Sequence, residues 1–189
     1  MKLLFYLVLA VGTATCGCRS ASTKPTLPHP QIVVVTRNNS YSLLYQLLNE
    51  EKDVGKLLII KRDSRELNRL VKEISTASGK AADQLKQFSE QDGSLALDVI
   101  DLPPGEEATR NAIASTKKRE LLGSSGDVFE RALLLTQIQA LNYAAHLASV
   151  AAENDTNSVR STWANSLSQE MSGLYSQSIE LLSRTPHGR

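Results

Sequence analysis

The chain has 189 residues, enough for one medium-sized domain, with 41% hydrophobic and 22% charged residues. Its 21 Lys and Arg balance 20 Asp and Glu to a net charge of +1, which excludes a strongly basic protein that binds nucleic acid through its overall charge. Aromatic residues make up only 5% of the chain, so any core must be built mainly from Leu, Ile, Val and Ala.

The N-terminus has the layout of an export signal. Lys2 supplies a positive charge, residues 3–11 are uninterruptedly apolar, and small residues follow as far as Cys18. The apolar run is shorter than the roughly 20 residues that a transmembrane helix needs. We therefore predict a signal peptide over residues 1–17 and an exported mature protein.

Both cysteines of the chain, Cys16 and Cys18, lie in the predicted cleavage region. A disulfide between them would close a very small, strained ring, and a metal site would lack nearby His or further Cys ligands. The interpretation we favour is lipid attachment, because Gly17-Cys18 resembles the lipobox of bacterial lipoproteins, where a small residue precedes an acylated cysteine. Thr15 stands where that motif usually has Leu. The resemblance implies lipidation at Cys18, with Cys16 as the alternative site.

Residues 18–38 are predicted to form a lipid-anchored tether and an extended arm. Three prolines between positions 19 and 30 favour an extended chain, and the β-branched run 32–36 suits a strand. No second segment of similar quality could pair with that strand. We therefore expect an arm that lies on the domain without forming a sheet, with His29 in the tether solvated.

Helical spacing begins near Ser40 and continues in two segments. The first segment carries apolar residues from Leu43 to Ile60. The second opens with a capping sequence at residues 63–66 and repeats apolar residues at intervals of three and four as far as Phe88. The short turn between them makes the two predicted helices antiparallel neighbours.

A long connection over residues 90–105 separates this hairpin from the second half of the chain, because Pro103 and Pro104 cannot lie inside a helix. A shorter helix is expected at 106–122, where the order of acids and bases suits the helix dipole. A long helix follows from residue 125 or 126, and the last helix runs from about 158 to 183. Their predicted inward residues are Phe129, Ala132, Thr136, Ala140, Tyr143, Leu147 and Val150 in the first, and Val159, Trp163, Leu167, Met171, Leu174, Ser178 and Leu181 in the second.

The fold class predicted from these elements is all-α. Two helical hairpins joined by one long link that carries a short extra helix are typical of a ferritin-like antiparallel four-helix bundle. The bundle is expected to occupy residues 39–184, followed by a frayed tail at 185–189.

Short motifs in both halves resemble a known bacterial family. They are Gly55-Lys56-Leu57, Lys61 and Glu66-Leu67 in the first hairpin, and Leu102-Pro103, Leu121-Leu122 and the run from Ser125 to Ala132 in the second half. Over residues 40–183 the chain is similar to the domain-of-unknown-function family 4142. Its members are ferritin-like, often exported, and often described as outer-membrane proteins, so the resemblance implies the same fold and an envelope location.

The chain departs from that family where metal ligands would lie. The resemblance places the family's two Asp-His pairs at Ala77-Ser78 and Ala140-Leu141, which cannot ligate a metal. A di-iron site of the ferritin type also needs Glu-x-x-His motifs. His146 is the one histidine in a predicted helix, and Tyr143 stands where that motif requires Glu. We therefore expect no cofactor and no metal.

Three polar residues on the predicted helices, His146, Glu51 and Asp53, are interpreted as surface residues without a catalytic or metal-binding role. His146 lies next to inward Leu147 and is placed at the edge of the bundle, with no nucleophile or orienting acid evident beside it. Glu51 and Asp53, near the family's acidic positions, are interpreted as a solvated acidic face. We assign no catalytic, cofactor-binding or metal-binding residue, and expect that the chain is not an enzyme.

Two functions from different classes fit these features. The first is a non-catalytic envelope lipoprotein, held at the membrane by its lipid, whose bundle is structural or binds an envelope protein partner. The alternative is a protein that binds a small ligand or metal in the bundle interior. Because Arg19 follows Cys18 where an inner-membrane retention signal has Asp, we expect the periplasmic face of the outer membrane, with the periplasm as the alternative. Neither function involves nucleic acid.

Overall fold

The computed structural model describes residues 30–59, 64–98 and 102–185. Its elements are α1 (Pro30–Glu51), the 3₁₀ helix η1 (Val54–Ile59), α2 (Arg65–Gln91), α3 (Pro104–Gly123), α4 (Gly126–Glu153) and α5 (Ser158–Arg184). These ranges contain helices and no strand, which confirms the all-helical prediction. None of the helices described is both long and apolar enough to cross a membrane.

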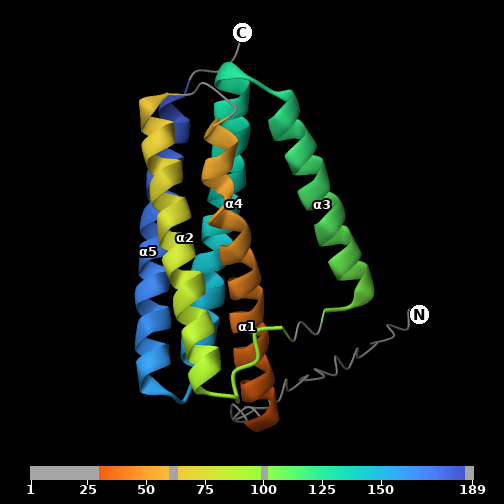
Figure 1. The fold of residues 1–189 in the computed structure, drawn as a ribbon, viewed down its shortest axis with the longest axis vertical. Coiled ribbons are helices and arrows are strands. Elements are labelled where there is room, and N and C mark those ends of the chain that lie inside the picture. Colours follow the sequence, from red (N-terminus) through yellow and green to blue (C-terminus); the bar gives the residue numbers. More distant parts are fainter. Residues whose placement is uncertain (1–29, 60–63, 99–101, 186–189) are drawn as a thin grey trace, which may run out of the picture.

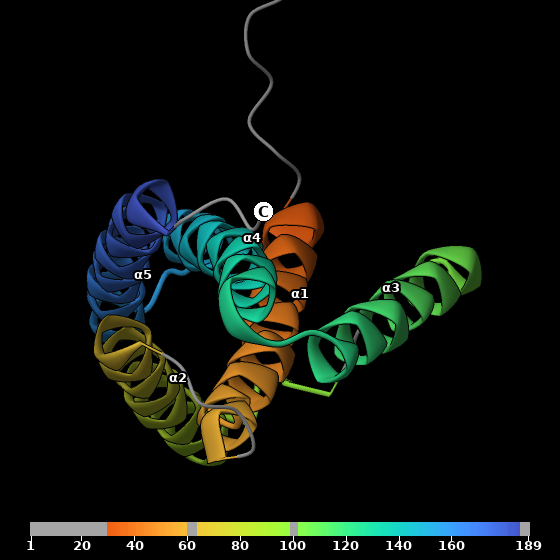
Figure 2. The same ribbon diagram turned by 90° about the horizontal axis from the view of Figure 1, so that it is seen from above.

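Four helices, α1, α2, α4 and α5, lie side by side around a common core, and we call these four the bundle (Figures 1 and 2). α1 packs against α2 and α4, and α5 packs against the same two helices. In Figure 1, α1 and α5 run upward whereas α2 and α4 run downward. Neighbouring helices around the bundle are therefore antiparallel, and both predicted hairpins are present.

Local chemistry sets several helix boundaries. α2 begins after Ser64, whose Oγ accepts a hydrogen bond from the backbone amide of Leu67 at 3.2 Å. α5 begins after Asn157, whose side-chain oxygen accepts from two backbone amides. Such caps satisfy donors that have no partner inside the helix. Gly126, with a φ of 55°, opens α4, and this left-handed conformation lets the chain turn sharply out of α3.

The predicted extended arm is wrong. Residues 32–36 lie in α1, which begins at Pro30, and Ile32, Val34 and Val35 are exposed on it. Proline is tolerated in the first turn of a helix, and β-branched residues disfavour helix by at most about 0.7 kcal/mol each. With no strand beside them, these residues pair their backbone groups within the helix. The helical domain therefore begins before residue 39.

The first predicted helix also ends earlier than its spacing indicates. α1 stops at Glu51, and the shorter helix η1 carries the chain on to Ile59, whereas the prediction runs one helix through to Ile60. Ile60 itself lies outside the described residues. The hydroxyl of Ser75 in α2 donates a hydrogen bond to the carbonyl of Lys52, which lies beyond the end of α1. This contact holds the turn against the second helix.

The end of the chain is more ordered than the predicted tail. Thr185 is 6% exposed, and its hydroxyl donates to the carbonyl of Leu181 at 3.0 Å. Its own carbonyl accepts a hydrogen bond from Arg131 at 3.1 Å. The tail prediction is thus wrong at Thr185, and residues 186–189 lie outside the described part of the chain.

One continuous hydrophobic core runs through the bundle. The residues predicted to fill it that are buried there include Ile74, Phe129, Leu147, Leu167, Met171, Leu174 and Leu181. Tyr143 and Trp163, also predicted inward, are partly exposed and pack against this core. Trp163 of α5 meets Phe88 of α2 edge to face, with ring centroids 5.3 Å apart. The predicted core is therefore confirmed in its main residues.

The buried face of α4 differs from the predicted one. Thr136, Ala140 and Tyr143 are only half-buried, and Val150 is exposed. The residues that α4 buries include Leu133, Leu134, Gln137, Leu141, Ala144, Ala148 and Ala151. α4 packs against both α1 and α5, so its buried arc is broader than one stripe and is turned away from the predicted residues. On α5, predicted inward Val159 is likewise exposed.

A buried polar cluster around Arg160 closes one end of the bundle. The guanidinium donates to both carboxylate oxygens of Asp155, at 2.7 and 2.9 Å, and to the carboxylate of Asp92. The hydroxyl of Tyr41 donates to Asp155 at 3.0 Å. The side chain of Arg160 is 4% exposed and that of Asp155 is fully buried. The cluster thus joins α1, the end of α2, the α4–α5 turn and α5.

Hydrogen bonding keeps the carboxylates of this cluster ionised. Burial acts to raise the pKa of Asp155, but hydrogen bonds from Arg160 and the Asn157 backbone outweigh it and hold the pKa below its ordinary value. Hydrogen bonds from Ser94 and Arg160 hold the pKa of Asp92 well below its usual range. Depressed carboxyl pKa values add stability that is fully present above the ordinary value of 3.8 and is lost as the pH falls below it.

The core assignment predicts a contrast between two substitutions. Leu167 is 3% exposed, so Leu167→Ala should lower the free energy of unfolding by about 2–5 kcal/mol, as truncation in a packed core does. His146 is exposed, so His146→Ala should change that free energy by no more than about 0.5 kcal/mol. Urea denaturation followed by circular dichroism measures both. Equal losses in the two variants would contradict this core.

Candidate functional site

The helix α3 is set off from the bundle. Figures 1 and 2 show it on the outer side of α1 and α4, continuous with α4 only through the short turn at its end. Leu121 is the one buried residue of α3. The helix is supported by its own exposed ion pairs, Arg110 with Glu106 at 2.7 Å and Lys117 with Glu120 at 2.9 Å.

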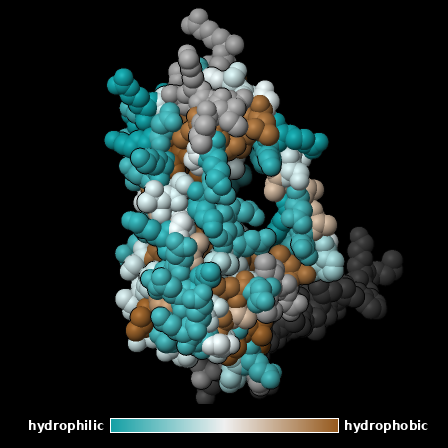
Figure 3. Space-filling view, viewed as in Figure 1, coloured by the Kyte–Doolittle hydropathy of each residue, from teal (hydrophilic) through white to brown (hydrophobic). Residues whose placement is uncertain are grey.

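An elongated cleft lies between α3 and the bundle. It consists of two hollows of about 480 and 450 Å³ that share Glu50, Glu51, Ala114, Lys117 and Thr136 in their walls. Figure 3 shows the opening between α3 and the bundle, with hydrophilic side chains along both of its sides. The cleft has room for a small organic molecule.

The inner walls of the cleft are largely apolar. The bundle contributes Leu43, Leu47, Leu133, Ala140 and Tyr143, and η1 contributes Val54 and Leu57. The helix α3 contributes Ile113, Ala114 and Leu121 among the polar groups, at spacings that place them on one face. Thr136, Ala140 and Tyr143, which the sequence pattern directs into the core, in fact face this cleft. Apolar walls of this kind favour a ligand with an apolar body.

Two polar atoms in the walls of the cleft are buried without a hydrogen-bond partner among the described residues. They are Oε2 of Glu51, the last residue of α1, and Oε1 of Gln137 in α4. The two side chains are also joined to each other by a hydrogen bond. Leaving a buried acceptor unsatisfied costs about 1–3 kcal/mol. Because native proteins seldom leave such groups unpaired, the two oxygens mark a place for a hydrogen-bond donor.

The carboxyl group of Glu51 has unusual acidity. Burial raises its pKa to about 7, against the lowering effect of the Gln137 hydrogen bond, and neighbouring Glu50 raises it further. Near neutral pH this carboxyl therefore exists in both its neutral and its ionised form. Acidic groups with pKa values displaced toward neutrality, in a cleft, are characteristic of binding or reaction sites.

The interpretation of Glu51 and Asp53 as a solvated acidic face is thus wrong for Glu51. It is confirmed for Asp53, whose exposed carboxylate pairs with Lys56 at 2.7 Å. Glu51 is covered because α4 and its Gln137 pass beside the end of α1. The spacing of apolar residues along one helix does not reveal such a neighbour. The stretch 132–141 is mostly apolar but contains Gln137 and Gln139, and this is a signal that sequence reasoning missed.

Two cations in the walls of the cleft, Arg110 and Lys117, are paired with groups other than Glu51, and a third, Lys118, is exposed. Arg110 bonds Glu106 and also donates to the hydroxyl of Tyr143 at 3.0 Å, with its guanidinium carbon 5.4 Å from the centre of the tyrosine ring. Lys117 pairs with Glu120. The contact between Arg110 and Tyr143 ties the far part of α3 to α4 and sets the width of the cleft.

The remaining residues singled out in the sequence are dispersed. Cys16, Cys18 and His29 lie outside the described residues. Ala77 and Ser78 are buried in α2, and Leu141 is buried in α4. His146 is exposed at the edge of the bundle, as predicted. Across the part of the chain that the structure describes, no three His, Cys, Asp or Glu side chains are grouped closely enough to hold a metal ion.

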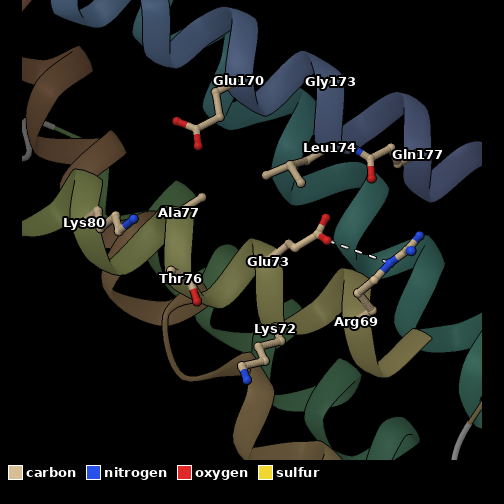
Figure 4. A pocket seen from close by; sticks show the side chains of 10 residues that line it. All are labelled: Arg69, Lys72, Glu73, Thr76, Ala77, Lys80, Glu170, Gly173, Leu174 and Gln177. Carbon is tan, nitrogen blue, oxygen red and sulfur yellow. Dashed lines mark ion pairs between the residues drawn. The ribbon is translucent and has the colours of Figure 1, made fainter. Parts of the chain in front are cut away.

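Another hollow, of about 570 Å³, lies between α2 and α5, away from the cleft (Figure 4). Its lining carries the charged side chains Arg69, Lys72, Glu73, Lys80 and Glu170. Arg69 and Glu73 form an exposed ion pair, 3.8 Å between nitrogen and oxygen. Exposed charges of this kind are satisfied by water and by each other. We therefore assign no site to this hollow.

Comparisons with protein-family models, with curated proteins and with solved structures found no match to the chain. The function is therefore argued from the residues of the cleft and from the N-terminal sequence.

The acidity of Glu51 predicts a pH-dependent stability. A raised carboxyl pKa adds stability that is fully present below the ordinary value of 4.5 and is lost as the pH rises to about 7. Glu51→Gln, which cannot ionise, should therefore be more stable than the parent chain at pH 8, by roughly 1–3 kcal/mol. It should also lose less stability between pH 4.5 and 7. Urea denaturation at stepped pH values measures both effects.

Asp53→Asn is the matched control for this experiment, because it removes an exposed carboxylate two residues away. It should leave the pH profile of the parent unchanged. Identical profiles for Glu51→Gln and the parent would contradict the burial of Glu51.

Proposed function

We propose that this protein is a non-catalytic bacterial envelope lipoprotein whose helical domain is a structural or partner-binding module. The charge, the apolar run and the small residues before Cys18 support export and lipid attachment. Anchoring by more than one acyl chain would hold the domain stably at a membrane, since a single chain binds only marginally. Arg19 after the cysteine favours the outer membrane, facing the periplasm.

We also propose that the bundle has the ferritin-like arrangement. Two antiparallel hairpins, one long link between them and the order of contacts around the bundle support it. The resemblance of residues 40–183 to the domain-of-unknown-function family 4142 supports the same arrangement. In this proposal the positions of the family's Asp-His pairs carry Ala77-Ser78 and Ala140-Leu141, and the bundle works without a metal.

The observation that carries the binding role is the exposure of α3. Its 20 residues project from the bundle with a single buried side chain, Leu121. Three large apolar side chains in this region are exposed to solvent. Ile113 and Leu122 on α3 are 56% and 45% exposed, and Val128 at the start of α4 is 59% exposed. A helix held away from a packed bundle presents both of its sides for contact with an envelope protein.

Small-ligand binding is the second candidate function. The unpartnered oxygens of Glu51 and Gln137 at the apolar cleft favour it. The bundle interior described here is filled by apolar side chains, whereas the cleft is open. We therefore place a ligand in the cleft between α3 and the bundle, outside the interior core.

Lipid attachment is tested by replacing Cys18 with Ser. The variant should lose labelling by a radioactive or clickable fatty acid and move from the membrane fraction to the soluble periplasmic fraction. Cys16→Ser is the control and should keep both label and membrane association. Labelling that persists in Cys18→Ser and disappears in Cys16→Ser would move the site two residues upstream. Membrane association without any label in the parent chain would contradict the lipoprotein proposal.

A further inference from the structure

The two unpartnered atoms in the cleft are both oxygens that accept hydrogen bonds. Oε2 of Glu51, an acceptor when the carboxyl is ionised, and Oε1 of Gln137 come from adjacent helices, α1 and α4, and both side chains line the same hollow. A ligand that satisfies both must donate at least two hydrogen bonds. A primary ammonium has three N–H donors, whereas a hydroxyl has one.

Charge points to the same group. The walls carry Glu50 and Glu51 together, and two of their three cations, Arg110 and Lys117, are already paired with glutamates of α3, which leaves exposed Lys118. An anionic ligand would meet these carboxylates at close range, which is unfavourable where water is partly excluded. A metal ion such as Ca²⁺ would need six to eight oxygen ligands, far more than the two unpartnered oxygens supply.

The apolar walls indicate what the ammonium is attached to. Leu47 and Leu133 on the bundle, Val54 on η1 and Ile113 on α3 line the same cleft as the polar pair. An alkyl or aryl body would cover this surface and displace water from it. An ammonium ion without such a body would leave water on the apolar walls, and its binding would gain no free energy from their burial.

We propose that the cleft between α3 and the bundle binds a primary amine carried on an apolar body, with Glu51 and Gln137 receiving the ammonium. This inference rests on the small-ligand function proposed above and names its ligand class. Lys117 is itself a primary ammonium on an alkyl stem and lines both hollows of the cleft. Its ammonium therefore competes with the ligand whenever it turns away from Glu120.

The test is a titration of the full-length chain, purified in detergent, with n-hexylamine. Isothermal titration calorimetry, with the same titration into detergent alone subtracted, gives the affinity. n-Hexanol and hexanoate are the matched probes, because they have the same alkyl chain and a neutral or an anionic head. Hexylamine should bind with one-to-one stoichiometry, hexanol at least about tenfold more weakly, and hexanoate least of all.

Two glutamate variants locate the ammonium. Glu51→Gln should weaken hexylamine binding on the order of tenfold or more, the effect of losing a hydrogen bond to a charged group. Glu50→Gln, at an exposed carboxylate of the same cleft, should change it by less than about threefold. Lys117→Met keeps the stem and removes the competing charge, so it should strengthen binding.

The outcomes separate this inference from the function on which it rests. Equal affinity for hexanol and hexylamine, or equal effects of Glu51→Gln and Glu50→Gln, would overturn the amine assignment and leave a less selective ligand cleft. Absence of binding by all three probes, in the parent and in Lys117→Met, would overturn both the amine assignment and the small-ligand function. Tighter binding of hexylamine that depends on Glu51 supports both.

Discussion

The buried pair formed by Arg160 and Asp155 is the contact on which the arrangement of this molecule depends. Apolar packing between leucine-rich helices is non-directional, so it stabilises several registers of two hairpins about equally. The guanidinium of Arg160 bonds Asp155 at two points and also reaches Asp92 at the end of α2. Tyr41 of α1 donates a further hydrogen bond to Asp155. These directional bonds fix how the α1–α2 hairpin lies against the α4–α5 hairpin.

The same end of the bundle determines where α3 begins. After Asp92 the chain passes along α1, where Arg37 donates to the carbonyl of Ser94 at 2.9 Å and Ser42 donates to that of Leu97 at 2.7 Å. These bonds hold the start of the long link to the side of α1. From there the chain enters α3, which rises outside the bundle and returns to it at Leu121. The cleft is therefore a consequence of anchoring the link at one end and the helix at the other.

Much of the helical pattern could be predicted from the sequence, because a stripe of apolar residues reports directly on burial along one helix. The bounds of α2, α3, α4 and α5 agree with that pattern, and Leu167 and Met171 are buried as it indicates. The stripe on α4 could not be placed correctly, because two neighbouring helices widen its buried arc toward residues such as Gln137. The β-branched run of α1 indicates a strand only if a partner strand exists.

The polar residues of the site and of the cluster could not be predicted from local pattern. Asp155 lies in the polar stretch 153–157, which indicates a solvated turn. Its side chain is nevertheless fully buried, because Arg160 and Tyr41 cover it. Glu51 ends α1 and is covered by α4. Part of each environment comes from a distant segment. Gln137 lies 86 residues from Glu51, and Tyr41 lies 114 residues from Asp155, although Arg160 is only five residues from Asp155.

The most direct test of this account is the free energy of unfolding of Asp155→Asn, measured by urea denaturation at neutral pH, beside Asp53→Asn. Asp155→Asn removes the fully buried carboxylate and leaves Arg160 with partly exposed Asp92 as its one remaining ionic partner, so the variant should lose about 3 kcal/mol, the lower end of the cost of breaking a buried ion pair. The exposed pair of Asp53 with Lys56 should contribute less than about 1 kcal/mol. Equally small losses in the two variants would contradict the role of the Arg160 cluster in holding the hairpins together.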